Sequence, residues 1–136
     1  MIFSALFNGK MAQRVFASFE ANVVVNGKAW NFGHYTGIFS GSIRQIGLEC
    51  NVFRHMLTQN DRFHAMGMNL SAKKILPYIR KIYFGKPVDS PHVVDEPADT
   101  MEIFLHEPMG YTIDGDMLPA TDKFRISVGP EIAVLV

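Results

Sequence analysis

Two aspartates separated by one glycine, Asp114, Gly115 and Asp116, form the pattern in this chain with the clearest chemical potential. They follow the run Tyr111-Thr-Ile113, which is typical of a strand end, so the two carboxylates are expected at a turn. Carboxylates at this spacing can bind a hydrated Mg²⁺ or accept a proton from a substrate hydroxyl. Asp and Gly also suit a tight turn for backbone reasons, so a purely structural turn is the competing interpretation.

The other reactive residue types form no recognised catalytic spacing. The histidines make no HExxH pair and no other metal-ligand pair on a helix, so surface or core positions are expected for them. Cys50 is the one cysteine, which excludes an internal disulfide and argues against a cysteine-based zinc site. The sequence also lacks the Gly-Lys-Ser/Thr ending of a P-loop and the G-x-S-x-G nucleophile elbow.

Composition narrows the class of protein. The 136 residues include 13 basic and 13 acidic side chains, so the formal charge of zero offers no broad basic field for nucleic acid. A hydrophobic fraction of 48% argues for a folded domain with its own core. The single cysteine favours a reducing, cytoplasmic compartment, although a secreted protein with few cysteines would have the same composition. The apolar opening Met1–Phe7 lacks the flanks of a signal peptide.

The pattern of elements predicts a mainly β, two-sheet sandwich or barrel-like domain with one or two peripheral helices. Apolar spacings of three and four predict a helical segment over residues 1–19, and residues 20–136 are expected to form the β-domain. Asn26-Gly27 follows a β-branched run and predicts a hairpin that returns over Lys28–Phe32. Further strands are expected at 63–70, 93–94, 101–105, 111–113, 123–128 and 132–136.

A basic helix is expected over residues 71–85. Ser71 can cap its start, Gly85 suits its end, and Pro77 should kink it or begin its second part. The simplest interpretation is that its cationic side chains form a solvent-exposed face; contact with an anionic membrane surface is the alternative. These cations are Lys73, Lys74, Arg80 and Lys81.

Two stretches carry a family resemblance. Tyr-Thr-Ile-Asp-Gly-Asp at 111–116 and Phe-Arg-Ile-Ser-Val-Gly-Pro-Glu-Ile-Ala-Val-Leu-Val at 124–136 resemble the end of the diacylglycerol kinase and sphingosine kinase family. The resemblance extends loosely over residues 20–136 and implies the C-terminal β-domain of a lipid kinase. The activity it implies is ATP-dependent phosphoryl transfer to a lipid hydroxyl, such as that of diacylglycerol or a sphingoid base.

The resemblance also assigns residues. Asp114 and Gly115 match the first two positions of the family's Asp-Gly-Glu turn, which implies a catalytic role, and Asp116 replaces the glutamate with a side chain one methylene shorter. A displacement of about 1 Å can cost on the order of 10²-fold in rate. In the family's middle motif Asp61 is retained as a candidate metal ligand, but His64 replaces the second aspartate, so metal is not expected to bind there.

The family's Gly-Gly-Asp-Gly-Thr nucleotide loop is absent from the sequence. ATP and Mg²⁺ are therefore expected only in the context of a full-length kinase, with neither tightly bound to this chain, and the isolated chain is expected to be inactive. The expected partners are a lipid substrate and a nucleotide-binding domain in cis or in trans, with no nucleic acid; peripheral membrane contact and a homo-oligomer are further expectations. A non-catalytic lipid-binding or protein-interaction module, and an unrelated structural β-protein, remain the alternatives.

Overall fold

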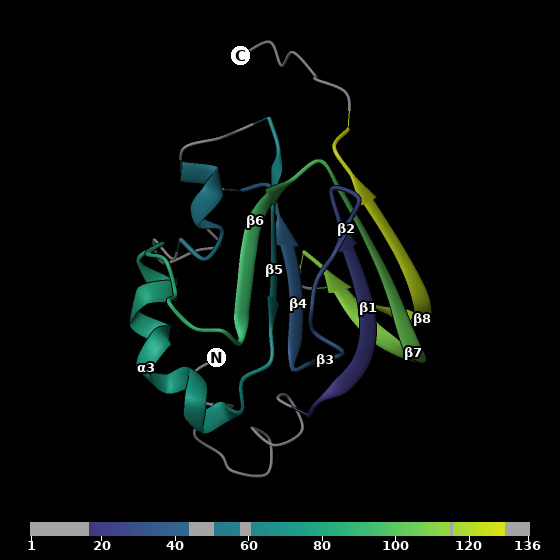
Figure 1. Cartoon of the computed structure of the whole chain (residues 1–136). Coiled ribbons are helices and arrows are strands. Elements are labelled where there is room, and N and C mark those ends of the chain that lie inside the picture. Colours follow the sequence, from purple (N-terminus) through teal and green to yellow (C-terminus); the bar gives the residue numbers. More distant parts are fainter. Residues whose placement is uncertain (1–16, 44–50, 58–60, 115, 130–136) are drawn as a thin grey trace.

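The chain folds into two antiparallel sheets with an α-helix packed on the outside (Figure 1). The computed structural model describes residues 17–43, 51–57, 61–114 and 116–129. The mainly-β two-sheet class is confirmed, and within these ranges no sheet closes into a barrel. The elements are β1 (Phe19–Val25), β2 (Lys28–Ala29), β3 (His34–Tyr35), β4 (Gly37–Gly41), the 3-10 helix η1 (Arg54–Leu57), β5 (Phe63–Met68), α3 (Ala72–Tyr83), β6 (Val93–Ala98), β7 (Thr100–Ile113) and β8 (Asp116–Ser127).

The larger sheet has the strand order β2-β1-β7-β8, with β3 also paired to β1, and the smaller sheet has the order β4-β5-β6. The chain passes from the smaller to the larger sheet at Asp99, between β6 and β7. Asn26 fixes this crossing, because its side chain accepts a hydrogen bond from the Asp99 N–H at 2.8 Å and donates one to the Pro97 carbonyl at 3.1 Å. The turn of the first hairpin thus holds the crossing between the two sheets, although the turn and the crossing are far apart in sequence.

The Asn26-Gly27 turn predicted from the sequence joins β1 to β2. Asn26 has φ 51° and Gly27 has φ 79°, the left-handed values that a two-residue hairpin turn requires. The returning strand is shorter than the predicted Lys28–Phe32 and ends at Ala29. Beyond the strand, the Trp30 backbone N–H still donates to the Val23 carbonyl of β1 at 2.9 Å, while its indole N–H donates to Glu96 of β6 at 3.1 Å.

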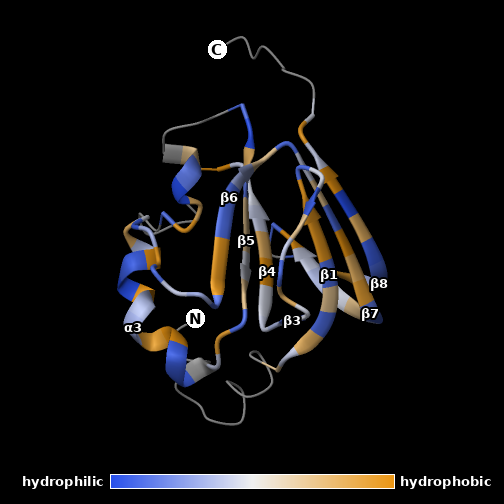
Figure 2. Cartoon of the chain, viewed as in Figure 1, coloured by the Kyte–Doolittle hydropathy of each residue, from blue (hydrophilic) through white to orange (hydrophobic). Residues whose placement is uncertain are grey.

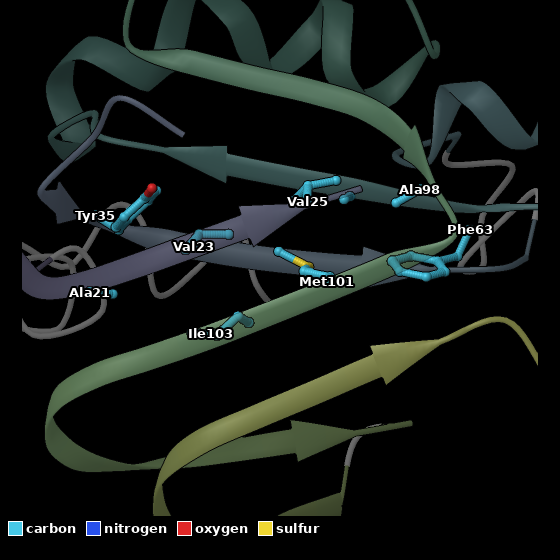
Figure 3. Packing of buried hydrophobic residues seen from close by; sticks show 9 residues of the cluster. Ala21, Val23, Val25, Tyr35, Phe63, Ala98, Met101 and Ile103 are labelled. Atoms are coloured by element: carbon cyan, nitrogen blue, oxygen red, sulfur yellow. The ribbon is translucent and has the colours of Figure 1, made fainter. Parts of the chain in front are cut away.

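The main core lies between the two sheets (Figure 3). Alternate residues of β1 and residues of its neighbour β7 supply one side of it, and residues of β5 and β6 supply the other side from the smaller sheet. Burying each large aliphatic side chain there contributes roughly 1.5–3 kcal/mol. Its buried members are Ala21, Val23, Val25, Tyr35, Phe63, Ala65, Ala98, Met101 and Ile103.

A second apolar layer lies between the smaller sheet and α3. Every residue of β5 is buried, because Phe63 and Ala65 face the main core while Met66 and Met68 face the helix. This two-sided burial explains why residues 63–70 alternate only roughly in hydropathy. Met66, Met68, Leu70 and Ile75 form the cluster, and Tyr78, Ile79 and Ile82 of α3 pack against it.

Helix α3 is held by its packing and by its C-terminal cap. Ser71 occupies the N-cap position, but its side chain makes no capping hydrogen bond. Gly85 adopts φ 68°, and its N–H donates to the Ile82 carbonyl at 3.1 Å, so the predicted glycine end is confirmed. The helix runs through Pro77, which lies on the exposed face. Proline has no N–H to bond to the carbonyl one turn earlier, but water can bond to that carbonyl on this face. No helix among the described residues has the length and apolar character needed to cross a membrane.

Other sequence predictions differ from the structure or lie outside it. The strands expected at 101–105 and 111–113 are parts of one long strand, β7, which passes through Pro108. The proline is tolerated because the pairing with β8 shifts register around Met109 and the pairing with β1 ends at Leu105. Residues 1–16 of the predicted helical segment 1–19 lie outside the described residues. Cys50 and the predicted strand 132–136 also lie outside them.

Candidate functional site

The acidic turn lies at the far end of the β7–β8 hairpin. Ile113 and Asp116 form the last strand pair, and Asp114 adopts φ 50°, a left-handed conformation that suits a two-residue turn. Both Asp114 and Asp116 are exposed, while Gly115 falls outside the described residues. The expected hairpin turn is present, and the carboxylates of Asp114 and Asp116 are in contact with solvent.

Apolar side chains surround the turn. Ile113 is 55% exposed and Met117 is 74% exposed, which is unusual for such side chains at the end of a paired strand. The turn therefore combines two carboxylates, which can bind a hard cation or accept a proton, with an apolar surface. No described contact occupies the carboxylate of Asp114 or Asp116, so both can meet a ligand or a partner domain.

A cavity of about 540 Å³ lies farther along the same hairpin. It forms between the start of β1 and the irregular part of β7, where the two strands no longer pair. Phe19 and Met109 supply apolar walls. The carboxylate of Glu20 lies between two histidines, with Oε1 3.6 Å from His34 Nε2 and Oε2 3.9 Å from His106 Nδ1. Neither aspartate of the turn lines this cavity.

A second group of ionisable side chains, the buried charge cluster, lies under η1 on the outer face of the smaller sheet. It consists of Arg54, His55, His64 and Asp95. Arg54 donates to both oxygens of Asp95, from Nε to Oδ2 at 2.7 Å and from Nη2 to Oδ1 at 2.6 Å. His55 Nε2 lies 3.5 Å from Asp95 Oδ1, and His64 Nε2 lies 4.0 Å from Asp95 Oδ2. Three elements, η1, β5 and β6, bring these four side chains together.

Burial controls the protonation of this cluster. Desolvation is the main cause that lowers the pKa of His64 to about 4, so the fully buried imidazole is neutral at pH 7. Burial alone would raise the pKa of Asp95, but the hydrogen bond and the charge of Arg54 outweigh it and lower that pKa. The hydrogen bond to Asp95 raises the pKa of Arg54. The cluster at neutral pH is therefore an ion pair beside a neutral histidine.

The cluster has the residue types of a metal site, but Arg54 occupies its carboxylate, and the His64 nitrogen that faces Asp95 carries a proton. His55, His64 and Asp95 each offer a ligand atom, and these atoms lie within 4.8 Å of one another. However, Arg54 already binds both oxygens of Asp95 and would repel a cation. His64 Nδ1 accepts the His55 backbone N–H at 3.3 Å, which places the proton on Nε2, the nitrogen that faces Asp95. The geometry favours a structural ion pair.

Local sequence patterns could not reveal this cluster, because its members lie at positions 54, 55, 64 and 95. Asp61, the candidate metal ligand, is exposed at the bend before β5 and is not part of the cluster. Its neighbour Arg62 instead pairs with Asp99 at 3.2 Å. Catalysis by the residues of the acidic turn remains a prediction, as does the expectation that Asp61, although a candidate ligand, binds no metal.

Three solved structures from Bacillus anthracis str. Sterne share the fold of this chain; two are described as a putative diacylglycerol kinase and the third as a diacylglycerol kinase. The first has a TM-score of 0.64 at 12% identity and matches 93% of this chain and 50% of its own. The second has a TM-score of 0.65 at 14% identity and matches 88% of this chain and 41% of its own. The third has a TM-score of 0.61 at 13% identity and matches 90% of this chain and 47% of its own. No protein-family model matches the sequence, and no curated protein does.

The chain spans about half the length of these solved structures. Its two sheets and outer helix therefore form a fold that these proteins contain as one part of a larger molecule.

Proposed function

We propose that this chain, whose fold is that of about half of a bacterial diacylglycerol kinase, is the substrate-side domain of an ATP-dependent lipid kinase. The observation that carries the proposal is the acidic turn, with Asp114 and Asp116 exposed at the end of a hairpin on that fold. A nucleotide-binding domain, in cis or in trans, would hold ATP opposite the turn. A cytoplasmic location belongs to the same proposal.

The reaction transfers the γ-phosphoryl group of ATP to a lipid hydroxyl, such as that of diacylglycerol or a sphingoid base. The hydroxyl oxygen bonds to the γ-phosphorus, the bond from that phosphorus to the β–γ bridging oxygen breaks, and ADP leaves. A carboxylate of the turn accepts the hydroxyl proton. The exposed Ile113 and Met117 beside the carboxylates supply apolar contact for the lipid or for the partner domain.

The residues of this chain fit the two cofactors differently. Carboxylate oxygens are the ligands that Mg²⁺ prefers, so Asp114 and Asp116 suit it. When bound, Mg²⁺ neutralises negative charge on the transferred phosphate. The sequence contains no Gly-Gly-Asp-Gly-Thr loop, so the cradle for ATP must come from the other domain.

A phosphorylation assay tests the proposal. The longest reading frame that contains this chain is incubated with γ-labelled ATP, Mg²⁺ and mixed micelles of diacylglycerol or sphingosine. We expect labelled lipid from the whole protein and none from the 136-residue chain alone. Asp114→Asn or Asp116→Asn should lower the rate by about 10²-fold or more, because a positioned general base contributes that much. Asp122→Asn, an exposed aspartate on the same hairpin, is the matched control and should retain the rate.

Other outcomes discriminate between the alternatives. If the whole protein makes no product but copurifies with lipid, the non-catalytic lipid-binding module replaces the kinase. If Asp114→Asn and Asp116→Asn both match the control, the turn has no catalytic role. Asp116→Glu restores the family's longer side chain and should raise the rate, by up to about 10²-fold if reach limits it.

A further inference from the structure

Helix α3 presents a one-sided cationic surface. Residues 72–86 contain five of the chain's 13 basic side chains and none of its 13 acidic ones. The five are all exposed, and none forms a salt bridge with another described residue. They are Lys73, Lys74, Arg80, Lys81 and Lys86. Because the whole chain is neutral, this concentration leaves the helix as a local positive patch.

The same outward surface carries large apolar side chains. Leu76 is 47% exposed and Phe84, directly after the helix, is 52% exposed. At about 100° per residue, these two side chains, Pro77 and the four helical cations fall within about 160° of the helix circumference. Figure 2 shows hydrophobic and hydrophilic segments alternating along α3.

The inner side of α3 fixes the orientation of this surface. Ile75 is buried, and Tyr78, Ile79 and Ile82 pack against the cluster that Ile75 forms with Leu70 and the methionines of β5. The helix therefore cannot turn its cations inward without losing this second core. Its outer surface is held as a face of the domain, with charge and apolar side chains side by side.

We propose that the outer surface of α3 docks the protein on an anionic lipid bilayer. Lys and Arg attract anionic headgroups, and the exposed Leu76 and Phe84 can enter the boundary between headgroups and acyl chains. A phosphate polyanion such as RNA would use the cations but would leave Leu76 without a role. The proposal deepens the lipid-kinase function on which its biological sense rests, because a lipid hydroxyl lies in a bilayer.

Vesicle co-sedimentation tests the docking surface without ATP. Vesicles of phosphatidylcholine alone are compared with vesicles that also contain phosphatidylglycerol, and binding is expected only to the anionic vesicles, weakening as salt is added. Each cation near an anionic membrane is worth about fivefold in affinity, so Lys73→Gln with Arg80→Gln should weaken binding about 25-fold. Glutamine keeps a helix propensity close to that of lysine and arginine, so α3 should remain folded.

The matched control places the same change elsewhere. Lys28→Gln with Lys123→Gln removes two exposed cations from the larger sheet and should leave vesicle binding unchanged. Phe84→Ser should weaken binding while preserving its salt dependence. The proposal is overturned if neutral and anionic vesicles bind alike, if the α3 variant matches the control, or if an RNA oligonucleotide displaces the vesicles. Failure of phosphorylation with vesicle binding intact would overturn only the kinase function.

Discussion

The acidic turn and the buried charge cluster contain similar side chains in opposite surroundings. Asp114 and Asp116 lie in solvent at the end of a hairpin, with no described partner for either carboxylate. Asp95 lies on β6 with both oxygens bound by Arg54 and a fully buried histidine beside it. The same functional group is available for chemistry in one place and committed to structure in the other.

The partners of a carboxylate, more than its residue type, separate a catalytic candidate from a structural one. A carboxylate with both oxygens bound can take a ligand only by releasing a cation into a poorly hydrated site, which is costly. A carboxylate in water keeps its lone pairs for a metal ion or a proton.

Asp95→Asn is expected to destabilise the fold by about 3 kcal/mol, because it leaves Arg54 half-buried without its anionic partner. Urea denaturation at pH 7 measures the loss. Asp99→Asn is the matched control, since it breaks an ion pair with Arg62 whose side chains are 42% and 53% exposed. That exposed pair should contribute less than about 1 kcal/mol. Equal losses in the two variants would show that burial does not distinguish the two ion pairs.

Stability is expected to fall by about 2 kcal/mol between pH 7 and pH 5 because of His64. Its folded pKa of about 4 lies below the usual 6.5, so the unfolded chain binds the proton more readily between these values. The contribution of the neutral His64 to the free energy of unfolding is therefore complete above pH 6.5 and is lost as the pH falls towards 4. Asp95 adds nothing in this window, because its lowered pKa affects stability only below its ordinary value of 3.8.

Urea denaturation at pH 7, 6 and 5 measures this slope. His64→Gln should flatten it, whereas His106→Gln, at an exposed histidine, should leave it unchanged. An unaltered slope in His64→Gln would place the responsible proton on another group.

The difference between the two regions also explains what the sequence could predict. The Asn26-Gly27 hairpin, the Gly85 helix end and the Asp114-Gly115 turn depend on adjacent residues, so local patterns predicted all three. The long strand β7 was not predicted, because its pairing with β8 carries it through Pro108.

The buried cluster was missed for a related reason. Arg54 and Asp95 lie 41 positions apart, and their contact depends on how η1 lies over β5 and β6. The sequence predicted the solvent-exposed candidate site and the two-sheet class, but not a site assembled by tertiary packing.

Gly41→Ala is expected to destabilise the fold by about 1–2 kcal/mol, because a Cβ there would lie 2.2 Å from the Phe53 ring. That ring packs beside His64 with centroids 5.6 Å apart, so the strain would reach the buried cluster. Gly33→Ala is the control, since its Cβ would meet nothing within 4 Å. Thermal or urea unfolding compares the two variants. A loss at position 33 as large as that at position 41 would contradict tight packing over the cluster.

The same chemical change that disrupts the cluster should leave the stability of the acidic turn almost unaltered. Asp114→Asn is expected to change the free energy of unfolding by less than about 0.5 kcal/mol, because asparagine tolerates the left-handed φ of 50° and no described partner is lost. Asp114→Ala should cost about 1 kcal/mol, since alanine adopts this conformation at a penalty. Urea denaturation of both variants beside Asp95→Asn gives the comparison directly. A loss above 1 kcal/mol in Asp114→Asn would show that this carboxylate has a structural partner, which would make the turn resemble the cluster and remove the reason to assign it to catalysis.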